Sequence, residues 1–279
     1  MLHASEIDEH ASLFHSREGV AVREFPLFRS VFHTAYEAIC RTRAELKLPF
    51  MQSDENNVRF IPERLWLHRT QSAARVKLRE AIGLYDSEGH AIFLPLYPAQ
   101  KSRSPQSKLQ RRKTAKVLTH EVVHYGSRGG VDEFSETLNE GITESHAQDI
   151  YHANIAPSYF GWKYDPVMSY PRETGICLVI NRLRPQTVLR LQQAFWTADS
   201  SAAEQIIEQD LGKDISSLLQ GSDKTDEQVV EIESALLKKY PGGENYFMCL
   251  LVAEIVCELK GIVTRKARSQ SPLGSAVRK

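Results

Sequence analysis

The chain has 279 residues, of which 35 are Lys or Arg and 35 are Asp or Glu, so its formal net charge is zero. Hydrophobic residues make up 42% of the chain and charged residues 25%, the composition of an ordinary globular protein that is large enough to bury a substantial core. A neutral chain has no overall field that would attract nucleic acid or a membrane surface, so we expect neither partner.

Cysteine usage and the N-terminal residues bear on the compartment. Four cysteines, at positions 40, 177, 249 and 257, show no C-x-x-C spacing and lie in apolar surroundings, as expected for reduced, buried thiols. Residues 1–19 contain no apolar run of the kind found in a signal peptide. We therefore expect a cytoplasmic protein, although delivery into a host cell by a dedicated secretion machine is compatible with the same composition.

The first third of the chain combines helix and strand patterns. Residues 1–55 favour helix, most clearly over 31–48, where apolar residues recur at helical spacing. Residues 57–62 indicate a short strand, and 82–94 indicate a β-hairpin with a glycine in its turn. Residues 98–113 are polar and basic, which predicts a solvated loop or the approach to a helix; the alternative is a patch that attracts an acidic substrate.

The segment most informative about function covers residues 117–144, VLTHEVVHYGSRGGVDEFSETLNEGITE. It contains an H-E-x-x-H pentapeptide in which His120 and His124 are one helical turn apart, so both imidazoles can point at one ion. An N-E-G triplet follows, and its Glu140 is again one turn from Glu144 on a single helical face. Apolar neighbours predict that the histidines are buried, and buried imidazoles need partners, which a metal would supply.

Two interpretations of this segment are open on the residues alone. In the first, two histidines and a glutamate bind zinc, which accepts imidazole nitrogen and carboxylate oxygen and, in catalytic sites, keeps a position for water. Zinc lowers the pKa of such a water to about 7, and Glu121 would take its proton and later pass it to the leaving amine. In the second, His120 and His124 are satisfied core histidines or polar residues of an amphipathic helix, and Glu121 is solvated.

The pentapeptide followed by L-N-E-G-I-T-E resembles the gluzincins, zinc metallopeptidases whose third ligand is a glutamate on a second helix. It is most similar to uncharacterised bacterial proteins that share both motifs. The resemblance implies that one Zn²⁺ ion is bound by His120, His124 and Glu140, with Glu121 as the general base. Glu144 matches an acidic position that hydrogen-bonds a ligand histidine and fixes its tautomer.

One departure from the gluzincin pattern leaves an alternative open. The gap between His124 and Glu140 is a few residues shorter than in thermolysin-like or aminopeptidase relatives. The roles of Glu140 and Glu144 are therefore interchangeable at this point, with Glu140 the preferred ligand. The motifs cover residues 117–144, and the flanking pattern fits more loosely over 80–200.

The resemblance also implies a place for the substrate and a donor for the oxyanion. Residues 90–97 are expected to form the sheet edge to which an extended peptide adds as a strand, and the alternative is a plain structural hairpin. Oxyanion donors in such sites are often Tyr, His or Arg. Tyr170 is the first choice, because a loop predicted over 156–170 would fold back over the zinc. Tyr151, on the glutamate helix, is an alternative.

From residue 171 onward the pattern is helical throughout. The predicted helices are 173–183, 185–197, 201–211, 214–219, 225–240 and 243–263. The last is strongly apolar, but charged residues interrupt it, which favours a buried core helix over a membrane span. His146 and His152 are spare histidines and are expected to be structural.

Together these patterns predict an α+β, zincin-like fold with a small N-terminal mixed sheet, an active-site helix and a helical C-terminal lobe. The expected units are a helical segment 1–55, a catalytic core 56–155, a helical lobe 156–263 and a disordered basic tail 264–279. The predicted activity is zinc-dependent hydrolysis of peptide bonds in a peptide or protein substrate. The alternatives are a zinc amide hydrolase that is not a peptidase, and a regulatory or interaction protein that retains a metal site without turnover.

Overall fold

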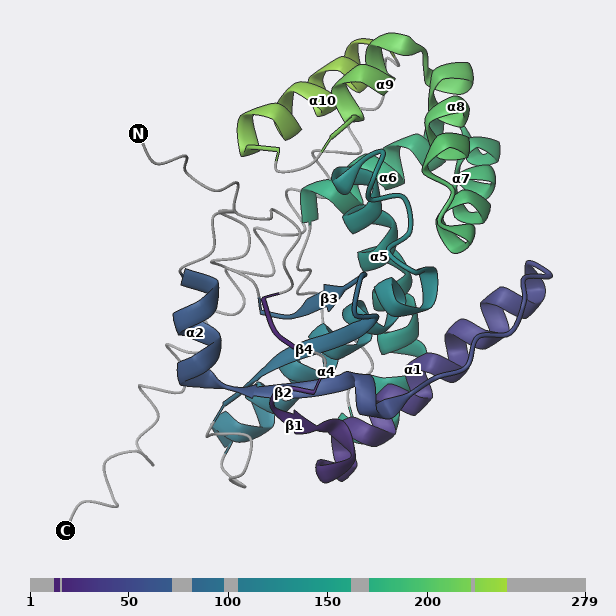
Figure 1. Cartoon of the computed structure of the whole chain (residues 1–279). Coiled ribbons are helices and arrows are strands. Elements are labelled where there is room, and N and C mark those ends of the chain that lie inside the picture. Colours follow the sequence, from purple (N-terminus) through teal and green to yellow (C-terminus); the bar gives the residue numbers. More distant parts are fainter. Residues whose placement is uncertain are drawn as a thin grey trace, which may run out of the picture.

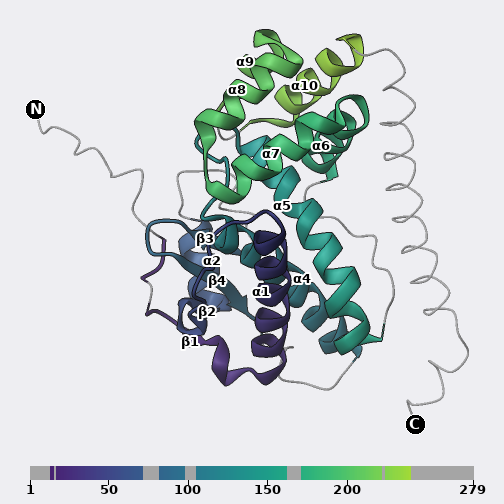
Figure 2. The same ribbon diagram turned by 90° about the vertical axis from the view of Figure 1, so that its right-hand side faces the viewer.

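A computed structural model describes residues 13–15, 17–71, 82–97, 105–161, 171–221 and 224–239. Within these ranges the chain is mostly helical and contains one small mixed sheet, which agrees with the predicted α+β class (Figure 1). The sheet and its covering helices form one part of the molecule, the C-terminal helices form another, and α5 extends between them (Figure 2). None of the helices in this part of the chain is long and apolar enough to cross a membrane.

The sheet has four strands in the order β1-β2-β4-β3, where β2 and β4 are parallel and the other pairs are antiparallel. Their bounds are β1 Val20–Ala21, β2 Val58–Pro62, β3 Leu84–Asp86 and β4 Ala91–Leu96. The predicted strand and hairpin are confirmed. The prediction that 90–97 is an edge is wrong, because β4 is paired on both sides and β3 is the outer strand. Five successive buried residues at the start of β4 are typical of an interior strand.

Helices cover both faces of the sheet, namely α1 (Pro26–Glu45) and α4 (Pro105–Ser127) on one side and α2 (Glu63–Gln71) on the other. On one face, Phe60 and Ile92 belong to the core shared with α1 and α4. On the other face, Phe93 belongs to a second cluster, in which the ring of Phe14 packs against both Phe93 and Trp66 of α2. Side chains alternate between the faces along each strand, so one short sheet supports two apolar layers.

Two segments of the N-terminal half differ from their predictions. Helix was expected throughout 1–55, but α1 is preceded by β1 and by the short 3-10 helix η1 (Val22–Glu24), and it begins at Pro26, whose fixed φ suits the first helical turn. Residues 98–113 were expected to form a loop or the approach to a helix, and from Pro105 onward they are the first turns of α4.

The chain reverses between α4 and α5 (Glu136–Ile150) through a tight connection. Arg128, Gly129 and Gly130 all have positive φ, at 57°, 87° and 63°, which turns the chain back within a few residues. The side chain of Asn139 accepts a hydrogen bond from the Val131 backbone N–H at 3.1 Å and so fixes this connection against α5.

α5 is capped by Ser135, whose hydroxyl accepts the Leu138 N–H, and it continues into η4 (Tyr151–Phe160), a π-helix that ends at the left-handed Gly161. The prediction of a loop over 156–170 is therefore wrong for residues 156–160, which are helical. Burial of Ala156 and Phe160 keeps this stretch helical in spite of Pro157. The rest of that predicted loop, including Tyr170, lies outside the described residues.

The C-terminal helices agree closely with the sequence prediction. They are α6 Pro171–Leu183, α7 Pro185–Thr197, α8 Ser200–Leu211, α9 Lys213–Leu219 and α10 Asp226–Lys239. The predicted helix 243–263 lies outside the described residues. α5 and α6 approach each other closely at Gly141, because a Cβ there would overlap the backbone of Glu173 and lie 2.6 Å from the sulfur of Cys177.

Candidate metal centre

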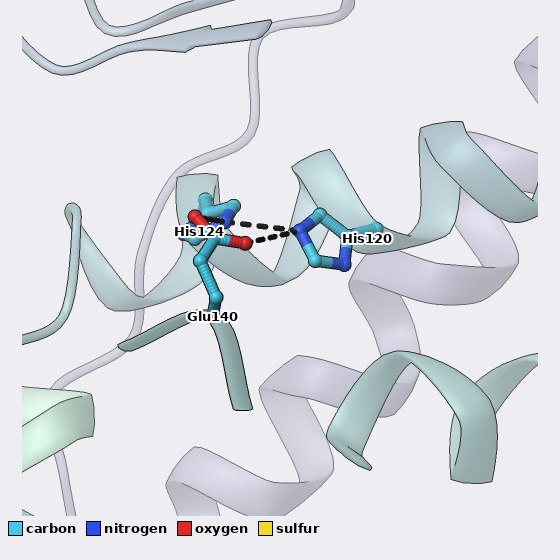
Figure 3. Close-up of side chains that lie close together, drawn as sticks. All are labelled: His120, His124 and Glu140. Atoms are coloured by element: carbon cyan, nitrogen blue, oxygen red, sulfur yellow. Dashed lines mark hydrogen bonds and ion pairs between the residues drawn. The ribbon is translucent and has the colours of Figure 1, made fainter. Parts of the chain in front are cut away.

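Three potential ligands from two helices converge at the centre of the fold. α4 presents His120 and His124, one turn apart, and α5 presents Glu140 (Figure 3). His120 Nε2 lies 3.1 Å from a carboxylate oxygen of Glu140, His124 Nε2 lies 3.4 Å from the other oxygen, and the two Nε2 atoms are 3.2 Å apart. These are the three residues that the gluzincin resemblance implied as ligands, and the structure brings them together.

These separations suit a metal ion. Ligand atoms held about 2.0–2.1 Å from a tetrahedral zinc ion lie about 3.3 Å from one another. The two Nε2 atoms are 3.2 Å apart, and they lie 3.1 and 3.4 Å from different oxygens of Glu140. One ligand atom from each of the three residues lies within 4.8 Å of the other two. Two imidazole nitrogens and a carboxylate oxygen also form the donor set that zinc accepts. The residues therefore fit a metal, while the geometry leaves the identity of that metal open.

The second nitrogen of each histidine has its own hydrogen-bond partner on α5. His120 Nδ1 lies 2.9 Å from a carboxylate oxygen of Glu144, and His124 Nδ1 lies 3.4 Å from the hydroxyl of Thr143. Both contacts leave Nε2 facing the point where the donors meet. Glu140 and Glu144 thus occupy different sides of His120, with Glu140 among the converging donors and Glu144 behind the ring.

The charge of the site favours a cation. His120 and Glu144 are 4% and 1% exposed, so solvent screens the carboxylates of this cluster only weakly. Burial by itself lowers the pKa of His120, but hydrogen bonds to Glu140 and Glu144 outweigh it and raise that pKa to about 10. Burial raises the pKa of Glu140, yet the two histidines reverse that effect and hold it far below the usual range. Both shifts have the same cause, the attraction between carboxylates and positive charge at the histidines, and a bound cation would be stabilised in the same way.

Glu121 occupies a different place from the three converging donors. Its side chain is buried at 7% exposure, and its carboxylate lies against the backbone of Gly83, where a Cβ would be 2.5 Å from Oε1. Burial raises the pKa of Glu121 above the usual value for a glutamate. The residue therefore combines the position expected of a general base, next to the ligands, with a carboxylate that holds a proton more readily than an exposed one.

The N-E-G triplet can now be explained residue by residue. Asn139 fixes the connection between α4 and α5, Glu140 faces the two histidines, and Gly141 allows α6 to pack closely. The triplet therefore both carries a candidate ligand and determines how the helix that bears it is packed. Each of its three residues therefore has a separate role in the geometry.

Several residues of the site were not found by sequence reasoning. Thr143 was missed, although it lies three positions after Glu140 and therefore on nearly the same helical face. Gly83 was missed because only the folded chain brings it to Glu121. Lys116 is buried on α4, one turn before His120, and its charge helps to lower the pKa of Glu144.

The remaining candidates have other surroundings. His146 packs against Trp196 and Phe195, with ring centroids 5.1 and 6.0 Å away, so it contacts an apolar neighbour as expected of a structural histidine. His152 is hydrogen-bonded to Gln148 on the same helix. Tyr151, the first residue of η4, is fully buried. The predicted oxyanion donor, Tyr170, lies outside the described residues.

Comparison of the chain with protein-family models, with curated proteins and with solved structures gave no match in any of the three. The gluzincin resemblance therefore rests on the motifs in residues 117–144 and on nothing broader. The case for function depends on the geometry of the residues themselves.

Proposed function

We propose that the chain is a zinc-dependent peptidase in which His120, His124 and Glu140 hold one zinc ion and Glu121 is the general base. When bound, zinc would supply a water of lowered pKa and an electrophile for the scissile carbonyl. The observation that carries the proposal is the convergence of one ligand atom from each of His120, His124 and Glu140, all within 4.8 Å of one another, beside the buried carboxylate of Glu121, which is not among them.

The protein's own residues would divide the chemistry between them. Glu121 would accept a proton from the attacking water at its carboxylate and return it to the nitrogen of the leaving amine. Its raised pKa suits a group that must both take and release a proton near neutral pH. Glu144 and Thr143 would keep the Nε2 atoms of His120 and His124 directed at the metal, since each binds the opposite ring nitrogen.

The position of β3 supports a peptide as the substrate. Within the described sheet β3 pairs only with β4, so its other edge is not paired by any described strand. Gly83, directly before β3, touches Glu121. An extended peptide hydrogen-bonded along this edge would run past the proposed base, which is how backbone recognition would present a peptide bond for cleavage. A small amide substrate would not need such an edge, so this feature favours a peptidase over a simple amide hydrolase.

Metal analysis tests the site. Wild-type protein purified without chelator is expected to contain about one equivalent of zinc, and His120→Ala and Glu140→Ala are expected to contain none, because each loses one of three protein ligands. His146→Phe is the matched control. It replaces a histidine that lies on α5, like Glu140, but that packs against the rings of Phe195 and Trp196. Metal-free wild type, or zinc retained in both ligand variants, would contradict the assignment.

The peptidase activity is tested by comparing the peptides generated in a cell lysate by wild type and by Glu121→Gln. New peptide termini with the wild type alone are expected, because the variant keeps the ligands and loses the base. Hydrolysis of small amides with no cleaved peptides would support the amide hydrolase instead. Zinc binding without turnover of either kind would support a regulatory or interaction protein.

A further inference from the structure

α5 and η4 form one helix that continues beyond the metal centre and carries a polar side chain at every fourth position. These residues are Glu140, Glu144, Gln148 and His152, which lie on one helical face because four residues make about one turn. The backbone stays helical across the junction, with φ −61° and ψ −47° at Tyr151. His152 lies in the first turn of the π-helix, a conformation that is rare and often found at functional sites.

From Glu144 onward, each of these side chains is hydrogen-bonded to the next one along the helix. Glu144 binds His120 Nδ1 through one oxygen at 2.9 Å, and its other oxygen accepts a hydrogen bond from Gln148 Nε2 at 2.5 Å. The amide oxygen of Gln148 in turn lies 2.9 Å from His152 Nε2. A continuous chain of hydrogen bonds therefore joins a candidate metal ligand on α4 to a half-buried histidine near the start of η4.

The chemistry of these groups fixes the direction of every bond. An ionised carboxylate only accepts hydrogen bonds, so the amide nitrogen of Gln148 must face Glu144 and its oxygen must face His152. His152 Nε2 must then carry a proton and donate it to that oxygen. At the other end, His120 Nδ1 donates to Glu144, so the lone pair of a neutral His120 is on Nε2, the nitrogen that faces Glu140 and would bind a metal.

We propose that Gln148 and His152 are positioning residues of the metal centre, which hold the carboxylate of Glu144 in the orientation that directs His120 at the metal. Glu144 is 1% exposed and Gln148 is 8% exposed, so little water can take the place of either partner. Without Gln148, one oxygen of Glu144 would lose its amide donor, so the orientation of the carboxylate toward His120 Nδ1 would be held less firmly. His152 acts through Gln148, because the Nε2–H that it donates to the amide oxygen keeps the Gln148 amide from flipping.

This inference rests on the proposed metal site, so its test measures metal binding directly. Gln148→Leu keeps the size of the side chain and removes the donor, and the affinity for zinc is expected to fall about tenfold or more, the effect typical of partners behind a ligand histidine. His152→Phe keeps the ring and removes the nitrogen, and a smaller loss of the same sign is expected. Affinity would be measured for each purified, metal-free protein by competition with a chromogenic chelator.

Two amide variants separate positioning from packing. The nitrogen of a glutamine side chain can occupy the place of His Nε2, whereas the shorter asparagine side chain places its nitrogen near Nδ1. His152→Gln is therefore expected to restore wild-type zinc affinity, and His152→Asn is not. The visible absorption spectrum of the Co²⁺-substituted protein provides a second measurement, because it responds to the orientation of the ligands and is expected to change in Gln148→Leu and His152→Phe.

Asn154→Ala is the control, since Asn154 lies on η4 and donates to the backbone of Ile150 rather than to this chain of hydrogen bonds. It is expected to leave zinc affinity and the Co²⁺ spectrum unchanged. Wild-type zinc affinity and spectra in Gln148→Leu and His152→Phe would overturn the positioning role and leave the metal site intact. A wild-type protein that binds neither zinc nor Co²⁺ would overturn the metal site and this inference with it.

Discussion

The helix pair α4–α5 and the helices α7–α10 place their polar residues in opposite ways. In α4 and α5, charged and polar side chains such as Lys116, His120, Glu121 and Glu144 are buried. In the described part of α7–α10, the buried polar residues are Thr187 and Ser216 alone. Charged residues there form ion pairs at the surface instead, as in the exposed contact between Arg190 and Asp210 at 3.1 Å.

The difference distinguishes a site from a scaffold. Burying charge costs free energy unless each group is paired, so a cluster of buried carboxylates and imidazoles lowers the stability of the fold. The same cluster provides the negative charge and the donors that bind a cation. Surface ion pairs contribute little in either direction. Substitutions of the buried charged residues in α4–α5 should therefore change function more than stability, whereas those of the surface charged residues in α7–α10 should change neither by much.

The largest effect is expected for Glu121→Gln. The amide keeps the shape of the side chain and removes the base, so kcat/KM on a peptide substrate should fall about 10²–10⁴-fold, while zinc content stays at the wild-type level. Because a buried carboxylate is lost, the Tm of the metal-free protein should stay the same or rise. Steady-state kinetics and calorimetry would measure both, and an unchanged rate would remove Glu121 from the mechanism.

The next largest effect is expected for Gly83→Ala. A Cβ at this position would lie 2.5 Å from both Glu121 Oε1 and a methyl group of Val117, so the carboxylate must move. Displacement of a reacting group by about 1 Å can lower the rate about 100-fold, and zinc content should not change. Ile82→Ala, at the exposed neighbouring residue, is the control and should retain full activity. Equal rates for the two variants would show that the clearance at Gly83 has no bearing on catalysis.

A smaller effect is expected for Thr143→Val. The substitution keeps the shape and removes the hydroxyl that lies 3.4 Å from His124 Nδ1, and zinc affinity should fall about tenfold or less because this contact is long. Thr119→Val is the matched control, since the hydroxyl of Thr119 binds the carbonyl of Ala115 within α4. Chelator competition would compare the two. A larger loss in the control would mean that helix packing, rather than the His124 partner, determines affinity.

The smallest effect is expected for Arg190→Ala in α7. Its ion pair with Asp210 is about half exposed, so the free energy of unfolding should change by less than about 1 kcal/mol, and neither zinc affinity nor activity should respond. Denaturant unfolding would measure the first quantity. A loss of metal in this variant would show that the C-terminal helices influence the centre, which would end the distinction between site and scaffold.

The same two regions differ in what could be predicted from the sequence. Both ends of α7 were predicted correctly, because Pro185 at the first turn is a local signal and the apolar spacing needs no tertiary information. His120, His124 and Glu140 were found because local spacing alone brings the first two together and the N-E-G motif supplies the third. For α7 and for these three residues, sequence reasoning succeeded because the decisive signals lie within one helix or one short motif.

The parts that were missed depend on contacts between elements. The outer position of β3 follows from the pairing of β4 with β2, which no local pattern reports. The approach of Gly83 to Glu121 likewise exists only after the sheet has packed on α4. Gln148 and His152 follow Glu144 at intervals of four residues, a pattern that a solvated helical face would also show. Only the hydrogen bonds that join them to His120 through Glu144 distinguish a support of the metal centre from such a face.

The tight reversal at Arg128–Gly130 has a consequence for the order of folding. Because it joins α4 directly to α5, every proposed ligand and its supporting carboxylate lie between residues 120 and 144, and the contacts among them are local in sequence. Local contacts form quickly, since little chain entropy is lost in closing short loops. We expect the two helices to meet early, so that metal present during synthesis would stabilise a helical hairpin before the later helices have docked.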